Sequence, residues 1–402
     1  MTSSHSIATT EPRLQVAAQE LIGTHASPTR STLIKLVKSR HFLLVICILV
    51  VCSTLTLGLW PFRAPKNTVT WLAHRNGLLF GKDATVLSTR SLLRSFPSDT
   101  GASLEIWVQP SRIWDSGTML AFCAPPKPFQ FSLRQDQTDI LLRALILDGR
   151  GHPTPANLRV NDVFRKPEPT FVTITWGLKG ARIYIDGLLS AAAPGFPASA
   201  LDFTGRLVLG DSPGQSDAWR GQLFGFAIYD RKMEAEQVLN NYAAWQRTGR
   251  PEPAWDEHNT TLYLFNEHIG RVVRDNAQSG VDLFIPPRYQ VVEKIVLEPF
   301  WTEFAMTRNY WEAVFKNIVG FVPFGICFYA YLATVPVKRA LLFTVVLGMA
   351  VSFTIEILQG FLPTRDSGTT DIITNTIGTW FGAVLSQQMA SRLGGFLSFG
   401  RL

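Results

Sequence analysis

Two acidic side chains, Glu356 and Asp371, are candidates for chemistry because each lies in otherwise apolar sequence near the C-terminus. Ionisable groups at membrane depth are costly and usually mark a functional site. A carboxyl group in such a place could act as a general acid/base on a lipid-linked substrate at the outer leaflet. The alternative for Glu356 is a position shallow enough for the side chain to stay hydrated.

Further polar residues accompany these two carboxyl groups. Ser352, Glu356 and Gln359 share one face of a predicted helix, and Asp371 and Asn375 share a face of the next one. Polar side chains in hydrocarbon cost several kcal/mol unless they face protein or water, so we expect these faces to meet in one outward-opening polar pocket. The predicted pocket residues are Asn317, Glu356, Gln359, Arg365, Asp366, Asp371 and Asn375, with the arginine and Asp366 at its mouth.

The amide side chains have a second interpretation. Asn317, Gln359 and Asn375 could serve only to hydrogen-bond neighbouring helices to one another. Gly378 and Gly382 lie four positions apart, a spacing that lets another helix approach closely. The sequence leaves both interpretations open.

Four apolar runs could hold these residues in a bilayer. The first, 42–60, carries no charge, and at about 1.5 Å per residue it is long enough to cross roughly 30 Å of hydrocarbon. Runs at 318–335, 340–361 and 372–390 follow, the last interrupted by Asn375 and two glutamines. The pattern predicts a transmembrane bundle of about four α-helices.

Basic residues predict the orientation of this bundle. Short basic flanks stay in the cytoplasm, and the first span is preceded by Arg30, Lys35, Lys38 and Arg40. With four spans, the tails 1–41 and 393–402 are then both cytoplasmic. We therefore predict a multi-pass protein of the cytoplasmic (inner) membrane whose long segment between the first two spans is extracytoplasmic.

Composition excludes some classes of function. The net charge is +7, but the basic residues are scattered rather than interleaved with aromatics in a stripe, so nucleic acid is not an expected partner. Of the four cysteines, Cys123 is the one outside the apolar runs. No Ser/His/Asp arrangement, metal-spaced His/Cys cluster or phosphate-binding loop is visible.

The segment between the first two spans has the pattern of an inserted all-β domain. We predict a linker at 61–99, a β-sandwich at 100–250, and additional strands with an interfacial segment at 251–313. Residues 103–108 alternate, placing Leu104, Ile106 and Val108 on one face. Further predicted elements are strands at 171–176, 181–187 with an Asp-Gly turn, 206–210 and 219–230, and a short amphipathic helix at 234–245.

The hairpin "YIDG" and the strand "WRGQLFGFAIYDR" with its trailing helix resemble the laminin-G or concanavalin A-like lectin family. That resemblance implies a two-sheet jelly roll that binds glycans or proteins, in some members through calcium. The motifs belong to the scaffold and do not identify ligand-binding residues. Trp107, Trp176 and Trp219 are expected to be core aromatics.

The C-terminal region 314–392 carries four ordered motifs: N-x-x-x-F-x-P-x-G from Asn317, E-x-x-Q from Glu356, P-x-R-x from Pro363 and D-x-x-x-N-x-x-G from Asp371. This order resembles the VanZ-like membrane family, and the first span with "LTLGLWPF" is similar to that family's first helix. The resemblance implies a bacterial membrane protein associated with low-level resistance to glycopeptide antibiotics such as teicoplanin.

These observations predict a multi-domain membrane protein, a helical bundle carrying an inserted jelly-roll sandwich. The leading functional hypothesis is a bacterial cell-envelope protein whose sandwich binds an extracytoplasmic glycan or envelope protein, with a link to glycopeptide resistance. The alternative is a membrane enzyme acting on a lipid-linked envelope substrate, with Glu356 or Asp371 as acid/base.

Overall fold

The computed structural model describes residues 40–92, 101–124, 127–147, 153–177, 179–196, 205–253, 259–277 and 279–398. Most of the two predicted tails, including Arg30, Lys35 and Lys38, lies outside these residues. The chain divides into two compact units. A helical unit comprises 1–58, 304–354 and 370–402, and a β-rich unit comprises 59–303 and 355–369.

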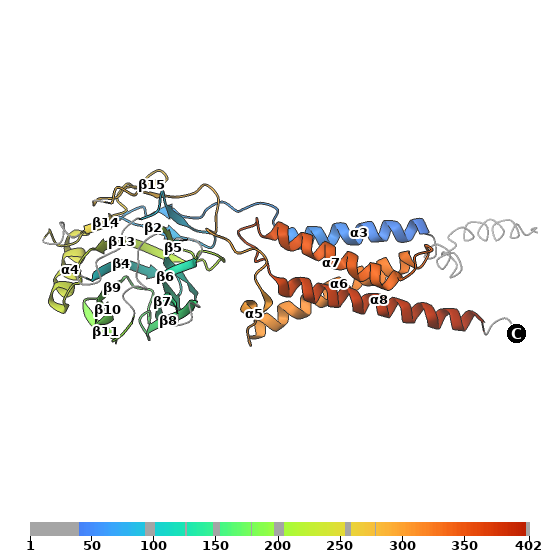
Figure 1. Cartoon of the computed structure of the whole chain (residues 1–402). Helices are drawn as coiled ribbons and strands as arrows, with labels where there is room; N and C mark the ends of the chain where they lie inside the picture. The colour runs from blue at the N-terminus through green and yellow to red at the C-terminus, as the bar shows by residue number, and fades with distance from the viewer. Residues whose placement is uncertain are drawn as a thin grey trace, which may run out of the picture. The chain divides into compact units, whose positions relative to one another are not determined.

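Two antiparallel sheets form the β-rich unit, and each has eight strands among the described residues (Figure 1). The first sheet runs β1 (Thr70–Trp71), β2 (Leu78–Phe80), β13 (Gly221–Tyr229), β4 (Ala102–Pro110), β9 (Thr170–Gly177), β10 (Gly180–Ile185) and β11 (Leu188–Ala193), with β14 (Asn259–Tyr263) also paired to β13. The second runs β15 (Val272–Val273), β16 (Leu283–Phe284), β3 (Val86–Ser88), β12 (Arg206–Leu209), β5 (Ser116–Ala124), β6 (Lys127–Asp136), β7 (Asp139–Leu147) and β8 (Pro153–Val160).

The alternation predicted in β4 is confirmed. Leu104, Ile106 and Val108 are fully buried in the core between the two sheets. The predicted Asp-Gly turn also forms, since Asp186 and Gly187 both have positive φ and join β10 to β11, as a two-residue hairpin of this type requires. The sequence pattern therefore places the inward face of the first sheet correctly.

A helix covers part of the outer face of the first sheet. Helix α4 (Ala235–Thr248) packs Val238 and Trp245 against Phe171 and Tyr229 in a second apolar cluster. The sheet makes room for this contact at Gly225, where a Cβ atom would lie 2.4 Å from the Trp245 ring. The predicted amphipathic helix is thus the element that closes this face.

The sandwich extends beyond the predicted range 100–250. Strands β1, β2 and β3 lie in 61–99, where the sequence pattern suggests a linker, and β14 to β16 lie in 251–313, where additional strands are predicted. Strands of two or three residues are too short to display alternation, so their sequence resembles that of a loop. Backbone pairing with other strands of the two sheets is what makes them strands.

Three helices within the described part of the chain are long and apolar enough to cross a membrane. They are α3 (Arg40–Leu59), α6 (Arg308–Leu332) and α7 (Ala340–Gln359). The fourth predicted span lies within α8 (Thr369–Ser398), which is helical but is not among these three. A four-residue helix, α5 (Phe300–Glu303), lies in the predicted interfacial segment.

Glycines bring α6 and α8 into close contact. A Cβ atom on Gly378 would lie 2.2 Å from the Ile318 carbonyl oxygen, and one on Gly382 would lie 2.1 Å from that of Val322. Real Cβ atoms do not approach backbone so closely, so both positions need glycine. The structure agrees with the close helix approach that the Gly-x-x-x-Gly spacing suggests.

Candidate functional site

Two hydrogen bonds tie polar side chains together within the helical unit. The Asn317 amide donates to Asp371 Oδ1 at 2.7 Å, which joins α6 to α8. The Asn375 amide donates to Ser352 Oγ at 2.9 Å, which joins α8 to α7, and both residues are buried. These hydrogen bonds are the ones expected if the amides join neighbouring helices to one another. They also satisfy polar groups that would be costly to leave without a partner in an apolar setting.

Glu356 belongs to a different group of contacts. Its side chain is 1% exposed, and Oε2 accepts a hydrogen bond of 2.9 Å from the Gly368 backbone N–H. The hydroxyl of buried Ser367 donates to the Glu356 carbonyl oxygen at 2.7 Å. The last turn of α7 and the loop that follows are therefore held together around this carboxyl group.

A lysine that the sequence analysis did not single out organises the same loop. Lys294 Nζ donates to the carbonyl oxygen of Gln359 at 2.8 Å and also to those of Leu362 and Arg365. Carbonyls at a helix C-terminus lack partners within the helix, and a cation satisfies them well. Burial lowers the pKa of Lys294, while the charges of Asp366 and Glu356 oppose that shift.

The segment after Lys294 pairs with the loop through its backbone. Leu297 N–H donates to Ser367 Oγ, Glu298 N–H donates to the Ser367 carbonyl, and Thr369 N–H donates to the Glu298 carbonyl at 2.8 Å. On its other side the segment contacts the sandwich, because Ile295 N–H donates to the Gly214 carbonyl at 2.9 Å and the Gln215 amide donates to Glu298. We call residues 294–298 the latch.

Arg365 donates from Nε and Nη2 to the Trp60 carbonyl oxygen, just after α3. The structure thus gathers Glu356, Gln359 and Arg365 with the latch, and it pairs Asn317 with Asp371 separately. Asp366 is exposed in the same loop. One pocket that joins all seven residues stays a prediction.

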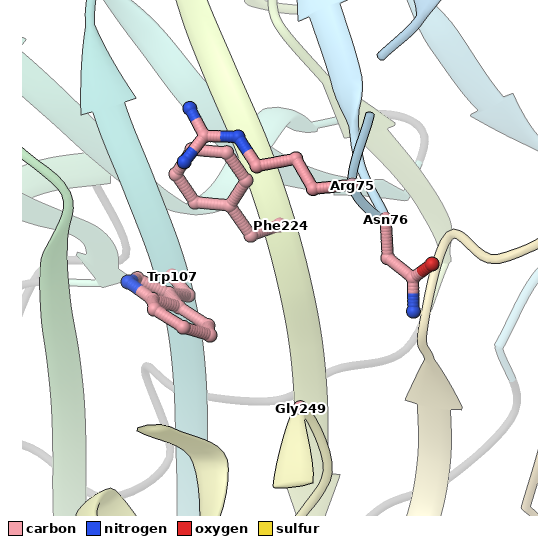
Figure 2. A pocket seen from close by; sticks show the side chains of 5 residues that line it. All are labelled: Arg75, Asn76, Trp107, Phe224 and Gly249. Carbon is pink, nitrogen blue, oxygen red and sulfur yellow. The ribbon is translucent and has the colours of Figure 1, made fainter. Parts of the chain in front are cut away.

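A cavity of about 190 Å³ lies on the outer face of the first sheet (Figure 2). Its lining residues are Arg75, Asn76, Trp107, Phe224 and Gly249. Trp176 and Trp219 lie in the core as expected, but Trp107 faces outward and packs at the edge of the α4 cluster. The alternation of β4 explains this, since residues adjacent to Ile106 and Val108 point away from the core.

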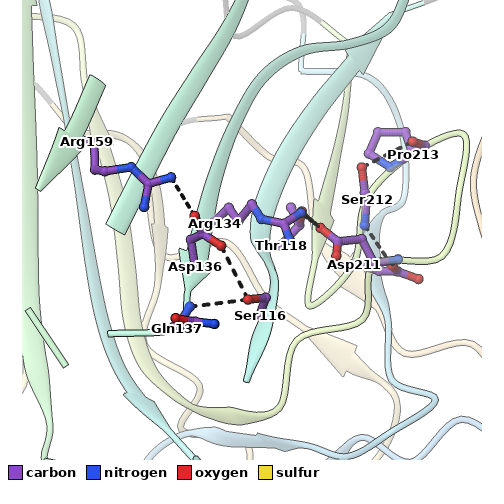
Figure 3. A network of polar contacts seen from close by, with 10 residues as sticks. Ser116, Thr118, Arg134, Asp136, Gln137, Arg159, Asp211, Ser212 and Pro213 are labelled. Atoms are coloured by element: carbon purple, nitrogen blue, oxygen red, sulfur yellow. Dashed lines mark hydrogen bonds and ion pairs between the residues drawn. The ribbon is translucent and has the colours of Figure 1, made fainter. Parts of the chain in front are cut away.

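A polar network joins strands β5 and β6 of the second sheet to the turn after β12, and Figure 3 shows Thr118, Arg134 and Asp211 within it. Asp211 is fully buried and accepts hydrogen bonds from the N–H groups of Ser212 and Asp217 and from the Tyr289 hydroxyl. Burial raises its pKa to about 7. Asp217 in turn pairs with Arg134 at 2.5 Å.

These two carboxylates do not fit a calcium site. Calcium needs several oxygen ligands directed at one point, whereas the oxygens of Asp211 and Asp217 are directed at N–H, O–H and guanidinium donors. Among the described residues no group of three or more His, Cys, Asp and Glu side chains could hold a metal ion. Calcium binding by the sandwich stays a prediction.

Glu105 is a second buried carboxyl group, beneath α4. Its Oε2 accepts hydrogen bonds from the Tyr229 hydroxyl at 2.8 Å, the Asn241 amide at 2.7 Å and the Trp245 indole at 2.8 Å. Burial raises the pKa of Glu105 to about 7. Because Asn241 and Trp245 belong to α4, this carboxyl group fixes the helix on the sheet.

Comparison with known families identifies both regions of the chain. Residues 262–390 match the VanZ/LLP1 family, and residues 80–239 match the concanavalin A-like lectin/glucanases superfamily. The VanZ/LLP1 match begins well before the helices and includes the latch. The sandwich match begins at residue 80, at the end of β2, in line with the strands found before residue 100.

Solved structures similar to this chain are distant. One is a Bacteroides ovatus ATCC 8483 protein with a proposed carbohydrate-binding role, 14% identical over 54% of this chain and 60% of that one, with a TM-score of 0.37. Another is the botulinum neurotoxin serotype D binding domain, 14% identical over 47% of this chain and 49% of that one, with a TM-score of 0.36. A heptameric SAP-like pentraxin from Limulus polyphemus is 12% identical over 57% of this chain and 98% of that one, with a TM-score of 0.35.

The chain thus spans less than two thirds of the first two of these proteins. No curated protein sequence matches it.

Proposed function

Because the chain joins a concanavalin A-like domain to a VanZ/LLP1 region in one membrane protein, we propose that it is a bacterial cell-envelope receptor. In this proposal the sandwich lies outside the cytoplasmic membrane and binds a glycan of the envelope. The VanZ-like helices respond to that binding within the bilayer. Both chain termini are cytoplasmic, as the basic residues before the first span predict.

The latch is the observation that supports a receptor rather than two independent domains. It contacts the sandwich at Gly214 and Gln215, and it contacts the loop 356–369 through Lys294, Leu297 and Glu298. That loop continues into α7 at one end and α8 at the other. A shift of the 211–217 turn on ligand binding would therefore be passed to the ends of two VanZ-like helices.

Substitution of Lys294 tests this coupling. Lys294→Met keeps the length of the side chain but removes the three N–H donors. We therefore expect unchanged glycan binding and loss of the effect that the wild-type protein has on teicoplanin susceptibility, which we call the envelope phenotype. Binding would be measured on a glycan array with the full-length protein in detergent, and the phenotype as teicoplanin susceptibility of cells that express each variant. Lys66→Met, a change at a lysine outside the latch, is the control. If Lys294→Met cells respond as the wild type does, the latch carries no signal.

Two further results would count against the proposal. Thiol labelling of single cysteines placed at 338 and 366 should reach them from opposite sides of the membrane, so labelling from the same side would overturn the topology. Glu356→Gln separates receptor from enzyme, because a receptor without acid/base chemistry tolerates a neutral isostere. Loss of the phenotype in this variant with folding and glycan binding intact would favour the enzyme.

A further inference from the structure

The cavity on the outer face of the sandwich owes its shape to a β-bulge. The pairing of β13 with β4 shifts between Leu223 and Gly225, which leaves Phe224 as the extra residue. Leu223 and Phe226 both point into the core, and the bulge lets Phe224 and Gly225 face outward in succession. Bulges of this kind re-aim side chains next to functional sites. Here the bulge brings Phe224 beside Trp107, with ring centroids 5.6 Å apart.

Arg75 is held in place above the Phe224 ring. Its guanidinium lies 4.1 Å from the centre of the Phe224 ring, and its Nη2 donates to the side-chain oxygens of Gln222 at 2.6 Å and Gln109 at 3.2 Å (Figure 2). Both bonds use Nη2, and a guanidinium carries further N–H donors on Nε and Nη1. Held in this orientation, the guanidinium can donate a charge-assisted hydrogen bond from Nε or Nη1 to a carboxylate oxygen.

Further positive charge lies next to one lining residue of the cavity in the sequence. Gly249, which lines the cavity, ends α4 in the left-handed conformation. A second cavity, of about 160 Å³, includes Arg247 and Arg250 among its lining residues, on either side of that glycine in the sequence. Two further arginines thus lie close in the sequence to a residue that lines the first cavity.

Aromatic rings beside a fixed cation suit a sugar ring that carries an acid. In such a complex the apolar face of a pyranose packs on the half-buried Trp107 ring, the Asn76 amide offers hydrogen bonds to hydroxyl groups, and the Arg75 guanidinium, held over the Phe224 ring, pairs with the carboxylate. The cavity volume is below the roughly 300–1,000 Å³ of sites for drug-sized ligands, so it fits one ring. We propose that this cavity binds a single carboxylate-bearing sugar residue of an extracytoplasmic glycan, with Arg75 as the residue that selects the acid.

This inference rests on the proposed glycan-binding function and adds the location and the charge of the ligand. The test compares tetragalacturonic acid with its methyl ester, since the two probes share every ring and differ in charge. Full-length protein in detergent is titrated with each by calorimetry. We expect the acid to bind at least about tenfold more tightly than the ester, with a preference that weakens as salt screens the charges.

Variants assign the preference to the cavity. Arg75→Gln should lower the affinity for the acid to that for the ester, whereas Trp107→Ala should weaken both. Arg90→Gln is the matched control, because Arg90 is an exposed arginine of the same domain that donates to the Gly280 carbonyl outside the cavity. A thermal unfolding curve like that of the wild type would show that Arg75→Gln is folded. The comparison of acid with ester then rests on this variant even if Trp107→Ala fails to fold.

Equal affinities for acid and ester, or an Arg75→Gln variant that keeps the preference, would overturn the inference. If an array then shows a neutral glycan bound, the proposed function survives without this site. If no glycan binds, both fail. An acetylated acidic peptide that binds through Arg75 while neither sugar does would make the ligand a protein and overturn the saccharide assignment.

Discussion

In the helical unit the buried Asn375 amide donates to a single side chain, that of Ser352, whereas the sandwich directs three donors at one oxygen of Glu105. The first arrangement joins two helices through one hydrogen bond, and removing either side chain leaves one neutral group without this partner. The second arrangement buries a carboxyl group that can ionise. Removing that carboxyl group leaves hydrogen-bond donors of three different residues without their acceptor. Polar groups in the helices should therefore be individually replaceable, and those in the sandwich should not.

The largest expected effect is that of Glu105→Ala. Removing the carboxyl group leaves the Tyr229 hydroxyl, the Asn241 amide and the Trp245 indole without their acceptor, so we expect a loss of about 3–5 kcal/mol in the free energy of unfolding. Thermal and urea unfolding of the full-length protein would measure it. Glu105→Gln keeps an acceptor oxygen at the same place and should cost far less. Similar losses for both variants would contradict this role of the shared acceptor.

The second largest effect is expected in the pH dependence of stability, because two buried carboxyl groups of the sandwich have raised pKa values. The pKa values of Glu105 and Asp211 are both about 7 in the folded protein, above their ordinary values of 4.5 and 3.8. The folded state therefore binds these protons more tightly, and the stability that they contribute is complete below about pH 4 and is lost as the pH rises through 7. At about 1.36 kcal/mol per pKa unit, the raised pKa values correspond to about 3 kcal/mol for Glu105 and about 4 kcal/mol for Asp211.

Unfolding midpoints of the wild type between pH 5 and pH 8 measure this loss. Glu105→Gln and Asp211→Asn should each flatten the profile and gain stability relative to the wild type at pH 8. A profile as steep in both variants as in the wild type would place the titrating groups elsewhere.

A smaller effect is expected where α6 meets α8. Gly382→Ala places a Cβ atom against the Val322 carbonyl, and overpacking of this kind costs about 1–3 kcal/mol. Gly320 is the matched control on α6, because a Cβ there meets nothing within 4 Å, so Gly320→Ala should be neutral or slightly stabilising. The helical circular dichroism signal during titration with sodium dodecyl sulfate would report both. Equal stabilities would mean that the helices can separate without cost.

Much of this fold follows from periodicity. The uncharged run 42–60 predicts α3, and the alternation from Leu104 to Val108 predicts both β4 and its buried face. The two-residue strand β1 gives no such signal. The bulge at Phe224 also breaks the alternation of β13, so the sequence alone does not show that Phe224 and Trp107 share a face.

The candidate site was predicted less completely for a similar reason. Ser352 and Glu356 lie four positions apart on one helix, and Asn375 lies four positions after Asp371 on the next. Residues at this spacing share a helix face, so the sequence indicates two polar faces. Lys294 contacts carbonyls that lie 65 or more positions away in the sequence. The sequence offers a lysine many possible partners, and the tertiary fold brings three carbonyl oxygens to this one.

The smallest predicted effect decides between the two interpretations of the helix amides. A double-mutant cycle on Asn375→Ala and Ser352→Ala should give a coupling of about 0.6–1 kcal/mol, as buried interhelical hydrogen bonds do. If these residues serve only to join helices, each variant loses this stability and keeps the teicoplanin phenotype under conditions in which it stays folded. If they line a pocket, the phenotype is lost while the coupling is small. The second outcome would mean that the helical unit, too, places polar groups for function, and the contrast with the sandwich would no longer hold.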